Sequence, residues 1–252
     1  MARTVIITGG SGAIGSLLVE RFLELGDQVF VTTARATSLQ ILEESAACGP
    51  GRLGGIVCDL SDQDAIDQLV EATPVGETGG FVLVNNARSR ATLRSGPDGF
   101  IQRSDFMAEY LLDVVVPYEL SMAMARRLDD RLEAVINIGS QYGSVASNPS
   151  LYEEGQQSGF VHYNVAKAAL HHLTRELAVR LAPIGTRVNA VAFGGLEDRV
   201  SDAFSRRYAA MVPNGRMLRA ADVPGPVVFL ASRDASAVNG HVLAADGGWS
   251  VW

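Results

Sequence analysis

A serine, a tyrosine and a lysine in the second half of the chain have the types and spacing of an acid–base site. Tyr163 and Lys167 are four residues apart in a stretch with helical periodicity, so both side chains project from one face of a helix. A phenol is a poor base at neutral pH, and a neighbouring cation favours its ionised form. Tyr163 is therefore the predicted general acid/base, and Lys167 is the cation predicted to activate it.

Ser140 follows an apolar, strand-like run and adds a hydroxyl donor to this pair. A hydroxyl there would donate to the oxygen of a carbonyl or an alcohol and stabilise the charge that develops on it. Tyr152 lies nearer to Ser140 in the chain, but Gln156 stands where its lysine would have to be. A tyrosine and a lysine at this spacing often pair incidentally on an exposed helix, so the prediction depends on the elements around them.

A glycine-rich turn near the start of the chain could hold the phosphates of a nucleotide. Thr8–Gly15 reads TGGSGAIG and lies between an apolar run at 5–7 and a helical pattern at 14–25 that Gly26 would end. Small residues permit a tight turn, and they let backbone N–H groups at the start of a helix approach a pyrophosphate. A turn without a ligand is the alternative when this motif stands alone.

The residues after the second apolar run bear on the choice between NAD and NADP. An acid there would accept from the ribose 2′-hydroxyl and repel a 2′-phosphate, but the chain has two threonines, an alanine and then Arg35. The cation favours NADP, with NAD as the alternative if Arg35 is only solvated surface. Asp59 follows the third apolar run, where it could accept from an adenine amino group or cap a helix at 62–72.

Apolar runs that alternate with amphipathic stretches predict the elements that position these residues. The expected strands are 5–7, 29–32, 56–58, 81–84, 134–138, 187–191 and 242–245. The expected helices are 14–25, 37–47, 62–72, 104–128, 161–181 and 222–230. This order is typical of a parallel sheet with helices on both faces. We therefore expect a single α/β domain over residues 1–252 with a doubly wound, seven-stranded Rossmann fold, in which polar segments at 143–160 and 194–220 frame the substrate.

Composition and charge argue against several function classes. The 252 residues are 47% hydrophobic and 19% charged, and the formal net charge of −7 disfavours a nucleic-acid partner. No apolar stretch is long enough for a membrane span and no signal-peptide core is visible, so we expect a cytoplasmic protein. Cys48 and Cys58 have no metal-ligand spacing, which predicts no metal site and fits a reducing compartment.

In their order along the chain, these motifs resemble the short-chain dehydrogenase/reductase family. They are Thr8–Gly15, Asp59-Leu60, Asn85-Asn86-Ala87, Asn137–Ser140, Tyr163–Lys167, Arg187–Asn189 and Asp246–Gly248. The resemblance implies an NAD(P)-dependent oxidoreductase that moves a hydride between nicotinamide and a carbonyl or secondary alcohol. The cofactor-binding residues expected from the turn and the resemblance are Gly9, Ser11, Gly12, Ile14, Gly15, Arg35, Asp59, Leu60, Asn85, Ala87, Tyr163, Lys167 and Gly194. A homodimer or homotetramer is also implied, and it would cover the terminal Trp249 and Trp252.

Five residues depart from the family's pattern, and they are Ala13, Arg88, Asp113, Phe193 and Asp198. Asp113 occupies the place of a helix asparagine that, in the family, holds a water linking the lysine to solvent. A carboxylate there is a predicted further catalytic residue and a counter-charge for Lys167. It would weaken the effect of the lysine on Tyr163 and raise the pH optimum. The alternative is a helix acid that faces elsewhere.

The two polar segments carry the sequence clues to the substrate. Arginines that could bind a phosphate or carboxylate are Arg199, Arg206, Arg207, Arg216 and Arg219. Side chains that could bind sugar hydroxyls are Glu153, Glu154, Gln156 and Gln157. We expect a polar substrate, sugar-like or anionic, and the 143–160 segment has a weaker resemblance to family members from bacterial surface-sugar and flagellin-glycan pathways. Solvated loops and subunit contacts are the alternative.

Two other function classes stay open at this stage. The glycines at 9, 12 and 15 have the spacing common in sugar-modifying epimerases and dehydratases that retain their nicotinamide cofactor. The departures at Arg88, Asp113, Phe193 and Asp198 also fit a catalytically weak dinucleotide-binding protein with a regulatory or structural role. The complete set of Ser140, Tyr163 and Lys167 favours an active dehydrogenase or reductase.

Overall fold

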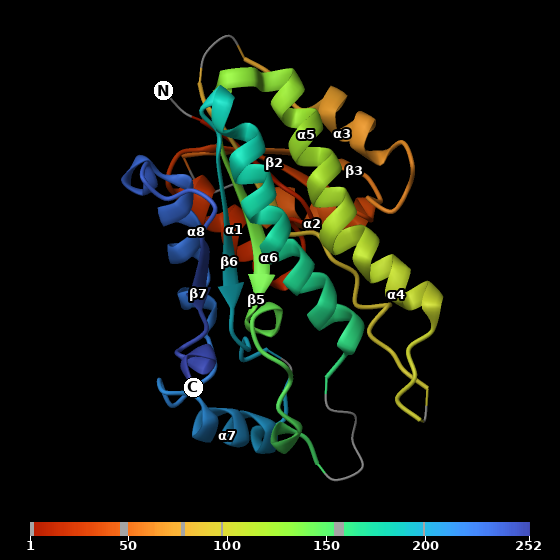
Figure 1. Cartoon of the computed structure of the whole chain (residues 1–252). Coiled ribbons are helices and arrows are strands. Elements are labelled where there is room, and N and C mark those ends of the chain that lie inside the picture. Colours follow the sequence, from red (N-terminus) through yellow and green to blue (C-terminus); the bar gives the residue numbers. More distant parts are fainter. Residues whose placement is uncertain (1–2, 46–49, 77–78, 97, 154–158, 199) are drawn as a thin grey trace.

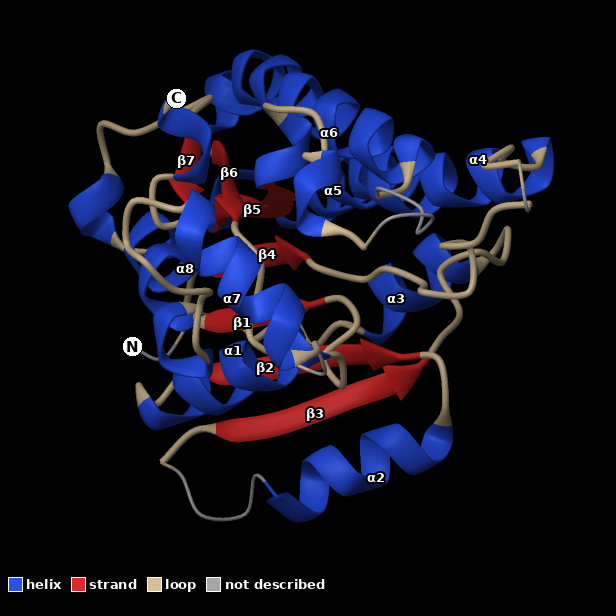
Figure 2. Ribbon diagram, turned by 90° about the horizontal axis from the view of Figure 1, so that it is seen from below, coloured by secondary structure: helices blue, strands red, loops and turns tan. Residues whose placement is uncertain are grey.

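A single parallel sheet forms the centre of the protein. The computed structural model describes residues 3–45, 50–76, 79–96, 98–153, 159–198 and 200–252. Within these ranges seven strands lie in the order β3-β2-β1-β4-β5-β6-β7 (Figure 2). Their bounds are β1 (Thr4–Ile7), β2 (Gln28–Thr33), β3 (Arg52–Val57), β4 (Phe81–Asn85), β5 (Leu132–Ser140), β6 (Arg187–Phe193) and β7 (Val242–Ala245). The strand order reverses between β1 and β4, which confirms the predicted doubly wound Rossmann fold.

Helices cover both faces of this sheet. One face carries α1 (Ala13–Glu24), α2 (Ala36–Ser45) and α8 (Pro224–Ala231), and the other carries α3 (Ala65–Ala72), α5 (Val116–Leu128) and α6 (Val161–Leu181). In β1, Val5 and Ile7 pack toward α1, while Ile6 packs toward α3 and α5. Successive strand residues point to opposite faces. A sheet covered on both faces therefore needs the continuous apolar runs seen in the sequence.

The carboxyl ends of the strands meet a third, smaller cluster of buried side chains. In Figure 1, β5 and β6 point toward α7 (Asp202–Met211) and toward the C-terminal end of the chain. The cluster joins the two substrate segments to the C-terminus, and its members are Leu151, Tyr208, Val212, Met217 and Trp249. This edge of the sheet therefore has a packed wall at the place where parallel α/β folds bind ligands.

Three sequence expectations need correction. The expected helix 104–128 is α4 (Arg103–Tyr110), a π-helical turn at Leu111–Val115, and then α5. The 194–220 segment is not a continuous loop, because α7 lies within it, capped by the Ser201 hydroxyl that accepts from the N–H of Phe204. The third strand begins at Arg52 and the third helix only at Ala65, since the residues between Asp59 and Ala65 form turns.

Some sequence expectations concern residues beyond this description. Cys48, Glu154, Gln156, Gln157 and Arg199 lie outside the described residues. Cys58 is a buried free thiol, and burial raises its pKa. None of the described helices combines the length and the hydropathy that a membrane crossing requires.

Candidate active site

The end of β5 and the start of α6 place the predicted catalytic residues. Ser140 is the last residue of β5, and its Oγ accepts from the N–H of Tyr142 at 3.2 Å. Tyr163 and Lys167 lie near the start of α6, and the Lys167 ammonium is 5.7 Å from the centroid of the Tyr163 ring. Lys167 also donates to the carbonyl oxygen of Ile138 at 2.9 Å. This bond ties α6 to the same end of β5 that carries Ser140.

Lys167 forms a buried ion pair with Asp113. The distance from Nζ to Oδ1 is 3.0 Å, and both side chains are almost fully buried. An ammonium has three N–H donors, and Asp113 and the Ile138 carbonyl take two of them. The structure thus brings together the lysine and the counter-charge expected from the sequence, whereas the effect of the pair on catalysis stays a prediction.

The π-helical turn between α4 and α5 presents Asp113 to the lysine. Asp113 is the middle residue of this turn, and π-helical turns inside α-helices are frequent at functional sites. Periodicity in the sequence could not predict the turn, because the apolar pattern continues through it. The second carboxylate oxygen of Asp113 has no hydrogen-bond partner within the described residues.

A second buried acid, Glu109, lies one turn before Asp113. It accepts a short hydrogen bond from the hydroxyl of Thr92, and the carbonyl of Thr92 lies 2.9 Å from Nε2 of the buried His162. Burial raises the pKa of Glu109, and the nearby charge of Asp113 raises it further. Sequence reasoning missed Glu109 and His162, because a buried acid on a helix has the same sequence signal as an exposed one.

Arg88 lies against the predicted proton donor. Its guanidinium carbon is 4.4 Å from the centroid of the Tyr163 ring, within the range of a cation–π contact. Arg88 follows the motif Asn85-Asn86-Ala87 at the end of β4, and its side chain is exposed. The sequence identified Arg88 only as a departure from a pattern, and gave no signal that it meets Tyr163.

The glycine-rich turn has the shape that a dinucleotide requires. Gly9 has a φ of +65°, and a Cβ there would be 2.8 Å from the Cα of Ala87. A Cβ at Gly15 would collide with the carbonyl oxygen of Gly9. The N-cap of α1 is Gly12, which has no side chain to accept from the first N–H groups of the helix. The residues present therefore fit a pyrophosphate at this helix start.

Hydrogen bonds hold this turn against the end of β4. The Thr8 hydroxyl accepts from the N–H groups of Asn86 and Ala87, both at 2.9 Å, and the Asn86 side chain donates to the carbonyl oxygens of Thr8 and Gly9. Ser11, Ala13 and Ile14 are at least partly accessible above it.

Asn85 takes part in the framework of the sheet. Its side-chain nitrogen donates to Oδ1 of Asn137 at 2.8 Å and lies 3.3 Å from the Ser121 hydroxyl, and Asn137 in turn donates to Thr174. These bonds join β4, β5, α5 and α6 in the interior. The Asn85 side chain therefore faces the core, its carboxamide oxygen has no partner among the described residues, and the role of Asn85 in cofactor binding stays a prediction.

The other expected cofactor residues lie along the carboxyl edge in different settings. Arg35 is exposed just past the end of β2, with no carboxylate in ion-pair contact among the described residues. Asp59 accepts from the N–H and hydroxyl of Ser61, and these bonds lower its pKa. Asp59 does not cap α3, which starts at Ala65, while Leu60 is buried.

Gly194 stands where β6 ends. Its N–H donates to the carbonyl of Ala245, and a Cβ at this position would approach the backbone of Asp246 to 2.9 Å. The next N–H, of Gly195, donates to the hydroxyl of Tyr208 at 2.8 Å. The chain here runs close to β7 and α7, so that only a residue without a side chain fits.

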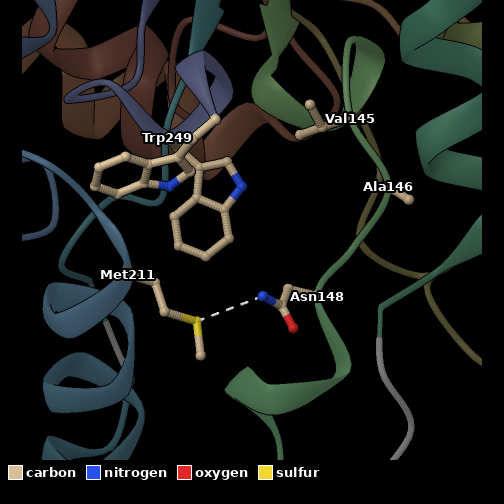
Figure 3. Close-up of a pocket in the computed structure, with 6 residues that line it drawn as sticks. Val145, Ala146, Asn148, Met211 and Trp249 are labelled. Atoms are coloured by element: carbon tan, nitrogen blue, oxygen red, sulfur yellow. Dashed lines mark hydrogen bonds between the residues drawn. The ribbon is translucent and has the colours of Figure 1, made fainter.

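A cavity of about 310 Å³ lies between the segment after β5 and the C-terminus. Its walls come from the segment after β5, from α7 and from the C-terminus, and the lining residues are Val145, Ala146, Asn148, Met211, Trp249 and Trp252 (Figure 3). Trp249 stacks on Tyr208, whose hydroxyl donates to Gln141 at 2.8 Å, next to Ser140 in the chain. Most of the side chains that line the cavity are apolar or aromatic, and the carboxamide of Asn148 is among its polar groups.

The arginines of the 194–220 segment are partly used within the fold. Arg216 makes a two-point ion pair with Asp222 at 2.6 and 3.1 Å, and this contact lowers the pKa of Asp222 to about 2. Arg207 donates to the carbonyl of Leu151 at 2.7 Å. Within the described residues, two of the five arginines are thus engaged in the fold, and an anion site formed by these arginines stays a prediction. Arg206 and Arg219 are exposed.

Comparison with known proteins agrees with this geometry. The family model described as enoyl-(acyl carrier protein) reductase matches residues 10–250. A short-chain dehydrogenase/reductase of Mycobacterium marinum superposes with a TM-score of 0.84 at 28% identity, over 98% of this chain and 95% of its own. The chain belongs to the short-chain dehydrogenase/reductase family.

Two further relatives show the chemistry that accompanies this family membership. L-rhamnose 1-dehydrogenase (NAD(P)(+)) of Azotobacter vinelandii is 32% identical over 99% of this chain and 97% of its own. Pseudomonas aeruginosa RhlG, solved as an active-site complex with NADP, has a TM-score of 0.84 and 26% identity over 99% of this chain and 97% of its own. This short-chain dehydrogenase/reductase is accordingly an NAD(P)-dependent oxidoreductase that acts on alcohol or carbonyl groups.

Proposed function

We propose that this enzyme moves a hydride between a nicotinamide and a carbonyl or secondary alcohol, with Tyr163 giving or taking the proton. The observation that carries the proposal is the position of the Lys167 ammonium. It lies 2.9 Å from the Ile138 carbonyl at the end of β5 and 5.7 Å from the Tyr163 ring. A cation fixed beside a phenol at the ligand-binding edge of the sheet supports acid–base chemistry there.

Each of the neighbouring groups has a proposed task. During reduction, the Ser140 hydroxyl donates to the substrate oxygen and Tyr163 transfers its proton to it. Lys167 keeps one N–H after its bonds to Asp113 and Ile138, and this donor is available to the nicotinamide ribose. The bound nicotinamide supplies or accepts the hydride.

We propose NADP as the preferred cofactor, held by the glycine-rich turn. Gly9, Gly12 and Gly15 leave room at the start of α1 for the pyrophosphate, and Ser11 and Ile14 border it. The exposed Arg35 after β2 would pair with a 2′-phosphate, because no acid stands there to repel it. The complex of RhlG with NADP supports this preference, although NAD is also accepted by the rhamnose dehydrogenase according to its name.

The substrate we propose is a sugar-like carbonyl or hydroxyl compound. Indole faces of Trp249 and Trp252 suit the C–H face of a sugar ring, and Asn148 offers an amide to its hydroxyls. The dehydrogenase from Azotobacter vinelandii is named for such a sugar. None of the described arginines lines this cavity, which favours a neutral sugar over the anionic alternative.

We also propose that the enzyme is a cytoplasmic homodimer or homotetramer. Apolar side chains are exposed along the helices of one face, and they include Met107 on α4, Tyr118 on α5, and Val165 and Val179 on α6. Exposed apolar side chains on adjacent helices mark surfaces that a second copy could cover. Light scattering of the purified protein measures the assembly, and a monomer at micromolar concentration would contradict it.

A substrate panel tests the proposed reaction. Aldoses and alditols are offered with NADP or NAD, and matched ketoses and aldonolactones with the reduced cofactors, while the absorbance of reduced nicotinamide is followed. We expect turnover of at least one sugar and a higher kcat/KM with NADP than with NAD. Turnover restricted to small apolar ketones would contradict the sugar assignment. Cofactor binding without turnover of any carbonyl or alcohol would contradict the reaction itself.

A further inference from the structure

Arg88 brings a second positive charge to Tyr163. The guanidinium carbon lies over the phenol ring at 4.4 Å from its centroid, closer than the Lys167 ammonium at 5.7 Å. A cation over the face of a tyrosine is attracted to the ring. The attraction grows when the phenol loses its proton, because the ring then carries a full negative charge.

The two cations differ in how far their charge is offset. Lys167 is in contact with the carboxylate of Asp113 at 3.0 Å, so at the ring the field of the pair is that of a dipole and weaker than that of a free ammonium. Arg88 forms no ion pair with a carboxylate among the described residues. The guanidinium also keeps its charge at every pH at which the enzyme is stable.

The other titratable groups that interact with these two cations come from three elements. They are Glu109 of α4, Asp113 of the π-helical turn, and His162 of α6, which interacts with Glu109. Burial raises the pKa of Glu109, whereas the hydrogen bond from Thr92 and the nearby charge of Arg88 lower it. His162 is fully buried with Nε2 against the Thr92 carbonyl. Arg88 therefore interacts with the Glu109 carboxylate without an ion-pair contact among the described residues, whereas Lys167 is in direct contact with Asp113.

We propose that Arg88 is a positioning and electrostatic residue that stabilises ionised Tyr163. It thereby adds to the stabilisation by Lys167, whose charge is partly offset by the Asp113 carboxylate. The inference rests on the proposed function of Tyr163 as general acid/base. Arg88 exchanges no proton. During oxidation the substrate hydroxyl gives its proton to the Tyr163 phenolate, during reduction the phenol returns it, and the guanidinium stays charged in both directions. Stacking also fixes the ring plane, so that the hydroxyl keeps its direction toward the substrate.

Titration of the tyrosinate absorbance of the cofactor-free protein tests the proposal without any substrate. Subtracting the curve of Tyr163→Phe isolates the titration of Tyr163 from that of the other five tyrosines. The same subtraction is made in the Arg88→Gln and Arg88→Lys backgrounds. We expect Arg88→Gln to move the midpoint upward by about 0.5–1 pH unit, as for a partly exposed charge near the ring. Arg88→Lys should retain at least half of the effect, because it keeps the charge.

Arg90→Gln is the matched control, since Arg90 is exposed two residues later in the same loop and has no ring contact among the described residues. It should leave the midpoint unchanged. An unchanged midpoint in Arg88→Gln, or an equal shift in Arg88→Lys and Arg88→Gln, would overturn the proposal. The proposed function has a separate test: if Tyr163→Phe abolishes turnover while Arg88→Gln leaves the titration unchanged, the reaction stands and the role of Arg88 does not.

With a substrate from the panel, the pH profile of kcat gives a second readout. Arg88→Gln should move the rise of kcat for alcohol oxidation upward by the same amount as the absorbance midpoint. The KM for the cofactor should stay within about twofold, because Arg88 contacts the phenol and not the glycine-rich turn. If KM changes while the pH profile of kcat does not move, Arg88 affects only binding, and this result also overturns the proposal.

Discussion

Lys167 and Asp113 form an ion pair with 6% and 1% of their side-chain surfaces exposed and 3.0 Å between Nζ and Oδ1. Two charges in the interior lose their hydration, and only close contact and further hydrogen bonds offset that loss. Here the Ile138 carbonyl supplies one further bond to the ammonium. The lysine is therefore held in place, at the cost of part of the positive field that it would exert on Tyr163.

The first prediction concerns the pH dependence of catalysis. Asp113→Asn keeps the shape and one acceptor of the side chain but removes its charge. We expect the rise of kcat for alcohol oxidation to move to lower pH by about one unit, because the uncompensated Lys167 then stabilises the phenolate more strongly. The measurement is the pH profile of kcat with saturating cofactor and substrate. A profile identical to that of the parent would contradict a role of Asp113 in tuning the site.

The second prediction concerns stability. Asp113→Ala leaves a buried ammonium with no counter-charge and should lower the free energy of unfolding by about 3–5 kcal/mol. Asp105→Ala is the matched control on the same helical stretch: 7% of the Asp105 side chain is exposed, but its partner Arg94 is 70% exposed and stays solvated. That control should lose much less stability, because the Arg94 charge that it leaves behind keeps its hydration. Urea unfolding at pH 7 measures both, and equal losses would contradict the account of the buried pair.

The third prediction uses His171, which lies beneath the catalytic strand. A Cβ at Gly139 or Gly143 would run into its imidazole, and burial lowers its pKa to about 4. Unfolded histidine titrates near 6.5, so between these values the unfolded chain binds a proton that the folded chain does not. Stability is therefore lost as the pH falls from about 6.5 to about 4, by about 2–3 kcal/mol.

His171→Gln should remove this part of the pH dependence. The free energy of unfolding of the variant is measured at a series of pH values and subtracted from that of the parent. His172→Gln serves as the control, because the neighbouring imidazole is 71% exposed and should contribute little. A difference curve that is flat between pH 4 and 6.5 for His171→Gln would show that the histidine is not held neutral.

Sequence periodicity predicted the order and type of the strands and most helices, because the strands of a sheet that is covered on both faces are continuous apolar runs. Two helical stretches on the α6 face of the sheet illustrate the limit of this prediction. Residues 161–181 form α6 as predicted, whereas the stretch before α5 contains a π-helical turn that leaves no mark in the pattern. Likewise, α7 was missed since it has no long apolar stripe: most of its side chains are only half-buried, and only Tyr208 is fully buried.

The sequence likewise predicted only part of the candidate site. Tyr163 and Lys167 follow from spacing on one helix, which is local information. The contacts of Lys167 with Asp113 and of Tyr163 with Arg88 join residues 54 and 75 positions apart, and only the packing of separate elements decides them. The sequence also contained no sign that the Asn85 side chain belongs to an interior hydrogen-bond network.

The fourth prediction concerns cofactor choice. Arg35→Ala should weaken NADP binding by about 10–100-fold, as expected for the loss of a charge-assisted hydrogen bond to the 2′-phosphate, with little change for NAD. Arg52→Ala is the control, since Arg52 is an exposed arginine at the opposite end of the neighbouring strand. Calorimetric titration with both cofactors measures the ratio. Equal weakening of NAD and NADP binding would show that Arg35 supports the folded turn and does not bind the 2′-phosphate.

The direct test of the central claim compares two tyrosines near the same strand end. Tyr163→Phe should bind NADP with unchanged affinity and lose about 10²–10⁴-fold in kcat, because the proton donor is gone while the cofactor turn is intact. Tyr152→Phe removes the hydroxyl of the tyrosine that lies nearer to Ser140 in sequence, and it should keep kcat within about threefold. Retained turnover in Tyr163→Phe, or an equal loss in Tyr152→Phe, would contradict the assignment of Tyr163 as the general acid/base.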